Sequence, residues 1–252
     1  LKLTGELSDA SRYNQNYQVF DSVLLNAINK LRYKTGQFID KEIGNNTIRA
    51  LNYTVNDYIA KIDANLERLR WKTAKPLGKK YIIINVADMT LEAYRNDTLA
   101  TKMKVCVGKP PLHKTPFLQS SIDKIILNPS WSIPRNIVLK ETSVIAASDT
   151  NYLKRNRIRV YANGSEISSS AANWSAMQNR EVSYQLIQEP GGHNALGRIK
   201  FSFPNPFAVY LHDTNAKKAF LRHNRAVSHG CVRLEKPLEL CFYALPDLQT
   251  ND

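Results

Sequence analysis

The chain has 252 residues, of which 43% are hydrophobic and 23% are charged, as in an ordinary soluble globular protein. Its 35 Lys and Arg residues exceed its 22 Asp and Glu residues, and the net charge of +13 favours polyanionic partners such as nucleic acid, anionic lipid or an acidic cell-wall polymer. No nucleic-acid-binding signature accompanies the basic residues and no stretch approaches the roughly 20 apolar residues of a membrane span, so we expect neither a nucleic-acid partner nor a span in this segment.

The first part of the chain, from about residue 19 to 71, has helical periodicity and predicts three amphipathic helices. Asn45 and Asn46 are candidate caps of the second helix, expected over 47–51, and Asn56 is a candidate cap of the third. The apolar positions at one-turn spacing are Val23, Ala27 and Leu31 in the first helix and Tyr58, Ile62, Leu66 and Leu69 in the third.

A basic stretch with Pro and Gly, "TAKPLGKK" (73–80), predicts a linker that separates a small helical domain (1–72) from a β-rich domain (81–252). The strands expected from alternating apolar residues cover 81–86, 90–95, 101–107, 123–127, 157–161, 183–187, 198–203 and 207–211. The first three should form an antiparallel meander. The sequence therefore predicts an α+β protein.

The pattern loosens between about 134 and 188, where we expect an insertion with a helix around 139–148 and a turn at 162–164. Such a segment is either a long surface excursion or a lid over a binding site. Its aromatic residues favour a cap rather than a packed core layer. They are Trp131 just before the insertion and Tyr152, Tyr161 and Trp174 within it.

Reactive residue types gather in "AVSHGCVRL" (226–234), which lies between expected helices at 215–222 and 236–245. A thiol becomes a strong nucleophile only as a thiolate, so Cys231 needs a base, and His212 at the end of a strand can supply one. Gly230 lets the backbone turn tightly, which leaves the N–H groups around Cys231 free to face an oxyanion.

Two other interpretations of these residues remain open. Cysteine is often a small buried hydrophobe and histidine a buried polar group with its hydrogen bonds met. A metal site could use His212, His229 and Cys231, but the chain has no paired CxxC and no H-E-x-x-H. The three cysteines also form no disulfide framework, and the sequence predicts neither a metal nor a cofactor. We expect His113, His193 and His223 on the surface or in loops.

The stretch "HDTNAKKAFLRHNRAVSHGCVR" (212–233) resembles the signature of the L,D-transpeptidase (YkuD-type) family: a histidine, an interval, Ser/Thr-His-Gly-Cys, an apolar residue and Asn or Arg. Fifteen residues separate His212 from Ser228, which fits that interval. Asp213 stands where many members have Gly, and Arg233 stands where Asn is commoner. The resemblance covers residues 80 to 246.

Two further stretches are similar to the long periplasmic (YcbB-type) branch of this family, whose insertion caps the active site. They are "TPFLQSSIDKIILNPSWSIP" (115–134) and "EPGGHNALGRIKFSFPNPFAVYLHDT" (189–214). The chain begins at Leu1 with neither Met nor a leader, so we expect that a targeting segment was removed or that the chain was shortened. The resemblance implies a periplasmic location.

The helical segment "LLNAINKLRYKTGQFIDKEIGNNTIRALN" (24–52) is similar to a peptidoglycan-binding repeat. Lys41 and Glu42 stand where that repeat usually has Asp-Gly, and Leu31 and Arg32 stand where it has Phe-Gln. A three-helix scaffold that only packs on the catalytic domain is an equally open interpretation.

The family resemblance implies that Cys231, activated by His212, attacks a tetrapeptide stem of peptidoglycan, expels D-alanine and passes the acyl group to another stem as a 3→3 cross-link. It also implies that carbapenem β-lactams acylate the same thiol. Gly230 would contribute to the oxyanion hole, and the residues expected to contact substrate are Tyr210, Ser228, His229 and Arg233. Arg233 could instead form a structural ion pair. The alternatives in function are an L,D-carboxypeptidase and a non-catalytic wall-binding module.

Overall fold

The computed structural model describes residues 1, 5–7, 19–37, 39, 41–73 and 77–245, without the side chains of residues 71–73. The chain divides between Pro76 and Leu77 into two compact units, which are described separately. Residues 74–76 of the expected linker and the last seven residues of the expected catalytic domain, 246–252, lie outside the described part. The expected α+β class is confirmed. No helix among the described residues is both long enough and apolar enough to cross a membrane.

The first unit contains the three expected helices: α1 (Ser22–Lys34), α2 (Asn45–Leu51) and α3 (Val55–Thr73). Arg32 of α1 is buried, and its guanidinium donates hydrogen bonds to the Thr47 hydroxyl of α2 at 2.9 and 3.2 Å. This residue, which departs from the peptidoglycan-binding pattern, therefore joins two helices.

The expected helix caps are wrong in this unit. Asn45 and Asn46 are the first two residues of α2, whose cap makes no side-chain hydrogen bond, and Asn56 lies inside α3. The start of α3 is held instead by Thr54 and Asp57: the Asp57 carboxylate accepts the Thr54 N–H at 2.8 Å, and the Thr54 hydroxyl accepts the Asp57 N–H at 3.3 Å. This reciprocal pair is a capping box, which satisfies two otherwise unpaired amides.

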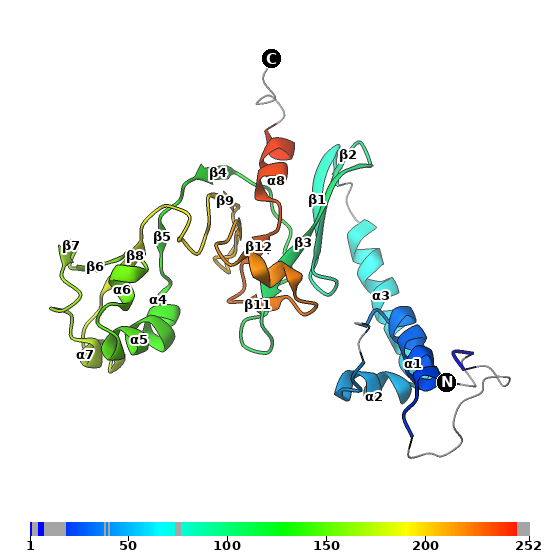
Figure 1. Ribbon diagram of the computed structural model, residues 1–252. Helices are drawn as coiled ribbons and strands as arrows, with labels where there is room; N and C mark the ends of the chain where they lie inside the picture. Colours follow the sequence, from blue (N-terminus) through cyan, green and yellow to red (C-terminus); the bar gives the residue numbers. More distant parts are fainter. Residues whose placement is uncertain (2–4, 8–18, 38, 40, 74–76, 246–252) are drawn as a thin grey trace. The chain divides into compact units, whose positions relative to one another are not determined.

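The second unit is built on an eight-stranded sheet in the order β1–β2–β3–β12–β10–β9–β4, with β11 paired to β3 (Figure 1). The expected antiparallel meander of β1, β2 and β3 is confirmed, whereas β10 and β12 run parallel. The strands are β1 (Lys80–Asn85), β2 (Thr90–Arg95), β3 (Thr98–Gly108), β4 (Lys124–Leu127), β9 (Ile199–Ser202), β10 (Leu211–His212), β11 (Ala226–Ser228) and β12 (Val232–Leu234).

One face of this sheet packs into the main hydrophobic core, together with helix α8 (Pro237–Ala244). Leu211 of β10 and Val232 of β12 are buried in this core with Leu240 of α8. Because successive side chains of a strand point to opposite faces, the neighbouring residues His212 and Arg233 lie on the other face. The core thus fixes one face of the strands, and the polar residues of β10 and β12 lie on the opposite face.

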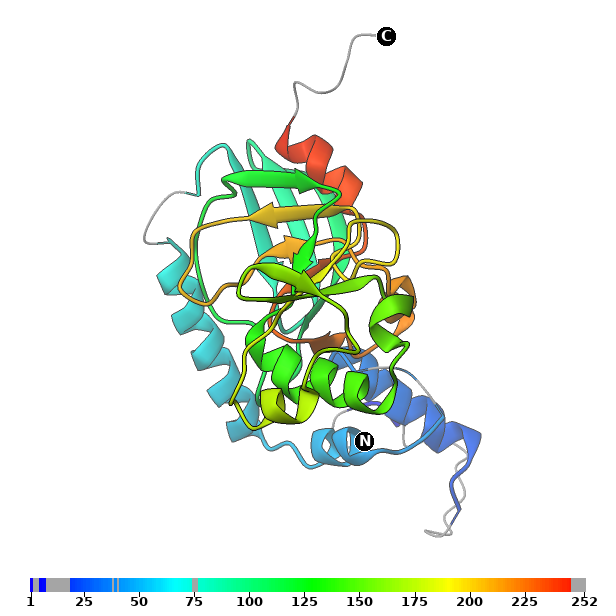
Figure 2. The ribbon, with the colours of Figure 1, turned by 90° about the vertical axis from the view of Figure 1, so that its left-hand side faces the viewer.

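The insertion is a folded subdomain rather than a loose excursion (Figure 2). Its four strands form a separate sheet in the order β5–β8–β6–β7, and eight buried residues, among them Leu153, Met177 and Leu186, make a core of its own. Its elements are β5 (Trp131–Ser132), α4 (Arg135–Ile137), the π-helical η1 (Val138–Thr142), α5 (Ser143–Ser148), α6 (Tyr152–Arg155), β6 (Ile158–Ala162), β7 (Ser165–Ile167), α7 (Trp174–Gln178) and β8 (Gln185–Gln188).

Three of the aromatic residues expected to line a cap, Trp131, Tyr152 and Trp174, belong to this second core instead. All three pack against its buried residues, and the Trp174 ring meets Tyr184 edge-on with centroids 5.9 Å apart. The expected turn at 162–164 is confirmed, with Asn163 and Gly164 at positive φ.

The strand expected over 207–211 is largely wrong, because only Leu211–His212 is extended in a ladder. The preceding residues form a turn around Asn205, whose side-chain oxygen accepts the N–H groups of Phe207 and Val209 at 3.1 and 3.0 Å. An asparagine side chain commonly replaces backbone bonds in such turns. The helix expected over 215–222 is a shorter 3-10 helix, η2 (Lys217–Leu221).

Buried amides hold the base of the insertion where the chain enters and leaves it. The Asn194 side chain is fully buried and donates to the carbonyls of Pro129 and Glu189 at 3.2 and 2.9 Å. The Gln188 side chain donates to Asn156 O at 3.0 Å and accepts the Ala195 N–H at 2.9 Å. Because buried amides are costly to leave unpaired, these bonds define one arrangement of the two connecting segments.

Candidate active site

Three polar residues lie in one row across neighbouring strands of the sheet. His212 of β10 is the ladder partner of Lys200 in β9 and of Arg233 in β12, so the imidazole lies between two cationic side chains on one face. Arg233 is in turn the partner of Cys106 in β3. The Cys106 thiol is fully buried on the same face, where it packs against Ala219 and Phe220, and burial raises its pKa.

Cys231 and Tyr210 each stand two residues before a member of that row and therefore share its face. The strand ends are tied together by the Val232 N–H, which donates to Tyr210 O at 3.1 Å. The Tyr210 ring meets the His212 ring edge-on with centroids 5.5 Å apart. The site residues of two distant sequence segments are thus brought together by one parallel strand pair.

The Cys231 side chain is a thiol in the resting protein. Burial raises its pKa, while hydrogen bonds from the main chain and side chain of Tyr210 and the charges of Lys200 and Arg233 act in the opposite direction. The pKa of Tyr210 is also raised, first by burial and then by the neighbouring Cys231. Both groups are therefore protonated at neutral pH.

His212 carries a neutral imidazole on the same face of the sheet. Its side chain is buried, and burial, followed by the charge of Arg233, lowers its pKa to about 3. Its Nδ1 contacts the carbonyl oxygen of Asp213. A carbonyl accepts only, so Nδ1 carries the proton and Nε2 is left as the basic nitrogen. Among the described residues no hydrogen bond joins the Cys231 sulfur to this ring; the thiol faces Ala208 O at 3.9 Å.

Asp213, which departs from the family signature, holds His212 in place. Its carboxylate accepts the Arg198 N–H at 2.9 Å and contacts the Lys217 ammonium. Gly197 has a φ of +60°, and a Cβ there would lie 2.3 Å from the Asp213 carboxylate. A side chain at position 197 would therefore displace the residue whose carbonyl orients the imidazole.

The turn that presents Cys231 corrects the expected oxyanion hole. Ser228 is buried; its hydroxyl donates to Cys231 O at 2.5 Å and accepts the Gly230 N–H at 3.1 Å. The Thr115 hydroxyl donates to Gly230 O at 2.8 Å. Gly230 N–H is thus already paired, and the Ser228 hydroxyl supports the turn. The Cys231 N–H has no acceptor among the described residues and remains available.

His229 faces the insertion. Its Nε2 lies 2.6 Å from a carboxylate oxygen of Glu141 in η1, and its ring meets His113 edge-on with centroids 4.7 Å apart. The imidazole next to the nucleophile's turn is therefore linked to the insertion by a polar contact. The expected loop position of His113 is confirmed, but the residue is a packing partner of His229 rather than an isolated surface group.

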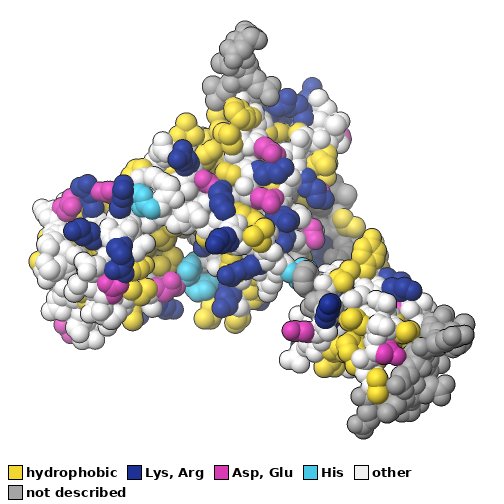
Figure 3. Space-filling view, in the orientation of Figure 1, with side chains coloured by type: hydrophobic (Ala, Val, Ile, Leu, Met, Phe, Trp, Pro, Cys, Tyr) yellow, Lys and Arg dark blue, Asp and Glu magenta, His cyan; other side chains and the backbone are white. Residues whose placement is uncertain are grey.

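Arg233 forms no ion pair with any described residue, so the interpretation as a structural ion-pair residue is wrong. The described residues contain no group of three His, Cys, Asp or Glu side chains placed to hold an ion. Basic side chains are scattered, with acidic ones between them, over the face shown in Figure 3.

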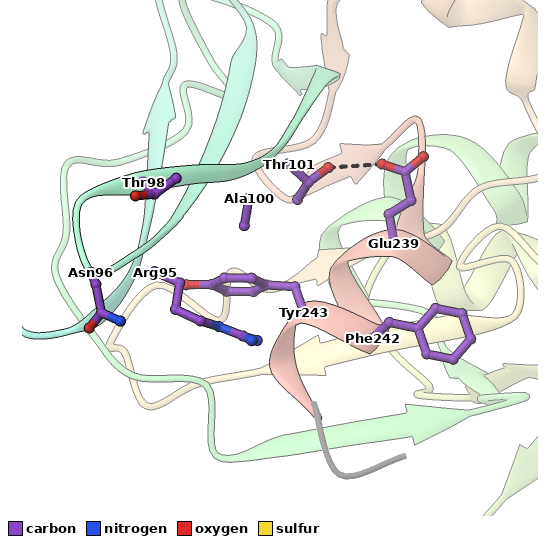
Figure 4. A pocket seen from close by; sticks show the side chains of 8 residues that line it. All are labelled: Arg95, Asn96, Thr98, Ala100, Thr101, Glu239, Phe242 and Tyr243. Atoms are coloured by element: carbon purple, nitrogen blue, oxygen red, sulfur yellow. Dashed lines mark hydrogen bonds between the residues drawn. The ribbon is translucent and has the colours of Figure 1, made fainter. Parts of the chain in front are cut away.

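A cleft lined by residues other than Cys231 lies between the β2–β3 hairpin and α8 (Figure 4). Its polar contact is a hydrogen bond of 2.8 Å from the Thr101 hydroxyl to the Glu239 carboxylate. It is lined by Arg95, Asn96, Thr98, Ala100, Thr101, Glu239, Phe242 and Tyr243, which include no nucleophile with an adjacent base. The chemistry of the sheet face therefore outweighs the depth of this cleft in locating the site.

Sequence reasoning missed four residues that shape the site: Lys200, Asp213, Thr115 and Glu141. Asp213 was noticed only as a departure from a signature. The others gave no signal because each contacts the site through pairing of distant segments, namely β9 with β10, Thr115 with Gly230, and η1 with His229.

Comparisons with known proteins point to one family of catalytic domains. The sequence profile of the L,D-transpeptidase catalytic domain (YkuD) matches residues 79–247. A curated Haemophilus influenzae protein, whose name assigns it provisionally to the L,D-transpeptidases, is 30% identical over 188 residues, or 74% of this chain and 37% of that protein. The chain thus spans little more than a third of that relative.

Solved structures of L,D-transpeptidases also align with 66% of the chain. The enzyme from Mycobacterium smegmatis shows 12% identity over 54% of its own length with a TM-score of 0.30. L,D-transpeptidase 1 from Mycobacterium tuberculosis shows 12% identity over 56% of its length with a TM-score of 0.26.

Proposed function

The chain belongs to the L,D-transpeptidase (YkuD) catalytic-domain family, and from this premise we propose that it forms 3→3 cross-links between peptidoglycan stem peptides through a thioester on Cys231. His212 Nε2 takes the thiol proton as sulfur attacks the carbonyl carbon between the third and fourth residues of a tetrapeptide stem. The C–N bond then breaks, His212 returns the proton to the departing amine of D-alanine, and the acyl group stays on sulfur. The side-chain amine of a second stem attacks this thioester and regenerates the thiol.

The observation that carries this proposal is the neutral imidazole of His212 on the face that Cys231 shares. Asp213 O holds the proton on Nδ1, which leaves Nε2 as the base. Because the thiol's own pKa is raised, proton removal accompanies attack rather than preceding it. Hydrogen bonds at catalytic sites often form only when substrate is bound, so the missing Cys231–His212 bond does not conflict with this role.

The remaining site residues have roles that follow from their positions. The Cys231 N–H is the donor proposed to face the oxyanion, and Gly230 shapes the turn that presents it. Tyr210 and Arg233 are proposed to contact the substrate beside the nucleophile, since Tyr210 packs against His212 and Arg233 is the ladder partner of His212. His229 contacts substrate only at the edge it shares with Glu141, and Ser228 supports the turn.

We extend the proposal to the rest of the chain. The insertion caps the site as in the YcbB-type branch, because its helix η1 reaches His229. Water exclusion under such a cap favours transfer over hydrolysis. The helical unit is proposed to act as a peptidoglycan-binding-like domain, the protein to work in the periplasm, and carbapenem β-lactams to acylate Cys231.

The test is intact-protein mass spectrometry after incubation with a tetrapeptide stem. The wild type should gain the mass of the stem less D-alanine, and Cys231→Ala should gain nothing. Cys106→Ala and Cys241→Ala are the matched controls and should keep the adduct, since both thiols are buried. An adduct that survives in Cys231→Ala would overturn the proposed nucleophile. A wild-type protein that forms no adduct, and whose Cys231 does not react with thiol reagents, would instead favour a non-catalytic wall-binding module.

A further inference from the structure

Two cations on the active-site face have no counter-ion. Lys200 and Arg233 flank His212 as its ladder partners, yet neither forms an ion pair or side-chain hydrogen bond with any described residue. Other cations of this unit do have carboxylates: Lys102 pairs with Glu92 at 2.7 Å, and Lys217 pairs with Asp213. Further cations of this unit, such as Lys104 and Lys124, also have no carboxylate partner among the described residues, but they are exposed, whereas Lys200 and Arg233 are half-buried.

The two side chains are also partly removed from solvent. The Nε of Arg233 is buried and has no hydrogen-bond acceptor. The Nζ of Lys200 lies 4.1 Å above the centre of the Tyr210 ring, which orders the ammonium over the site. A buried donor without an acceptor costs free energy that a bound acceptor restores, so the pair is built for an anion.

The position of His212 identifies which anion fits. In the proposed reaction this imidazole gives its proton to the amine of the departing residue. In a tetrapeptide donor that residue is the last, so its amine and its terminal carboxylate are attached to the same Cα. A carboxylate so close to the imidazole must lie beside the two residues that flank it, Lys200 and Arg233.

We propose that Lys200 and Arg233 form a carboxylate site that recognises the free C-terminal carboxylate of the donor's leaving residue. This inference rests on the proposed function and adds the feature that selects the donor. A stem extended by one residue presents an uncharged amide to the pair, and its carboxylate lies farther along the chain. The pair therefore favours stems that end directly after the scissile bond.

The bound carboxylate also affects the base. The charges of Arg233 and Lys200 are two of the causes that lower the pKa of His212, after burial. A carboxylate between them offsets both charges and makes the imidazole a stronger base once the correct donor is bound. Recognition of the donor and activation of the thiol are thus coupled.

The experiment measures the second-order rate of acyl-enzyme formation with two donors, a tetrapeptide acid and the same tetrapeptide as its C-terminal amide. Hydrogen bonds to charged groups predict that the wild type prefers the acid by about ten- to hundredfold. Lys200→Gln should slow the acid about tenfold or more relative to the amide, so that the preference collapses. Lys200→Arg should restore much of it, which a merely structural role of the lysine would not explain.

Lys104→Gln is the matched control, because it removes one exposed positive charge from β3 of the same sheet. It should keep the wild-type preference. A Lys200→Gln protein that keeps both its adduct and the wild-type ratio of acid to amide overturns the carboxylate site while leaving the proposed function intact. A wild-type protein that forms no adduct with either donor overturns both.

Discussion

The active-site face and the insertion differ in how they satisfy their charges. In the insertion, Arg159 meets the carboxylates of Glu166 and Glu189 at 3.1 and 2.5 Å, and Arg155 meets Asp149. On the active-site face, Lys200 and Arg233 have no carboxylate partner among the described residues although both are half-buried, whereas the unpaired cations of the insertion, such as Lys140 and Arg180, are exposed. Both regions have a complete hydrophobic core, so the unmet charges are not a defect of folding. A region that leaves cations unpaired beside a thiol and an imidazole is organised for a ligand.

The two regions meet at a polar contact. His229, next to the nucleophile's turn, is joined to Glu141 of η1, while buried amides hold the base of the insertion. The insertion is thus fixed at its base and tied to the active-site face by a pair that is partly exposed. The substitutions below alter either the active-site face or its contact with the insertion.

The largest effect should come from removing the base. His212→Ala should lower the rate of acylation by a tetrapeptide stem or a carbapenem by about 10²- to 10⁴-fold at pH 7, because the thiol's raised pKa leaves little thiolate without it. The measurement is the time course of adduct mass for wild type and variant. Undiminished labelling of His212→Ala would show that another group activates the thiol.

A side chain at position 197, next to the Asp213 carboxylate, should destabilise the region that holds His212. In Gly197→Ala the new Cβ meets Asp213, which adds about 1–3 kcal/mol to the roughly 1 kcal/mol cost of a side chain at positive φ. Gly164→Ala is the control, because that glycine also has positive φ but no atom near its Cβ position. Denaturant unfolding should give a larger loss for Gly197→Ala. Equal losses would mean that Asp213 yields freely and does not fix His212.

Burial of neutral His212 should make stability depend on pH. Its folded pKa of about 3 lies below the unfolded value of about 6.5, so between these values the unfolded chain binds more protons. The free energy of unfolding should therefore fall as the pH falls below 6.5, by at most about 1.4 kcal/mol per pH unit from this residue. His212→Gln should lose that contribution, whereas a substitution of the exposed His223 should keep it. Parallel pH curves for wild type and His212→Gln would contradict a neutral buried imidazole.

The smallest effect should come from the contact between the regions. Glu141→Gln should slow cross-linking by about two- to fivefold, the size expected for a partly exposed ion pair, with little change in alkylation by a small neutral reagent. Glu166→Gln, which removes a carboxylate wholly within the insertion, is the control. Equal slowing of cross-linking and alkylation would argue against a cap that acts on the peptide substrate.

Much of this architecture follows from local sequence. The meander was predictable because alternation and turn residues define β1 to β3 over short spans, and the helix positions followed from one-turn spacing. The boundary positions of His212 and Cys231 were predictable, since His212 ends β10 and Cys231 immediately precedes β12, whereas their catalytic pairing stays a prediction. The turn at 207–210 was not, since an apolar run does not reveal that Asn205 replaces the ladder bonds.

The parts that could not be predicted depend on contacts between distant segments. The insertion's own core joins residues from Ile133 to Leu186, and its polar Ser-rich stretch obscured that periodicity. Whether Gly230 N–H is free depends on the rotamer of the Ser228 hydroxyl. The missing counter-ion of Arg233 is visible only when every neighbour on the sheet face is known.

The most direct test of the account is the product formed by the whole protein from purified tetrapeptide stems, identified by chromatography and tandem mass spectrometry. The account predicts a dimer whose mass is that of two stems less one D-alanine, joined between the third residues of both. A released tripeptide without dimer would identify a hydrolase. Unchanged tetrapeptide, together with no detectable acyl-enzyme, would contradict catalysis by Cys231.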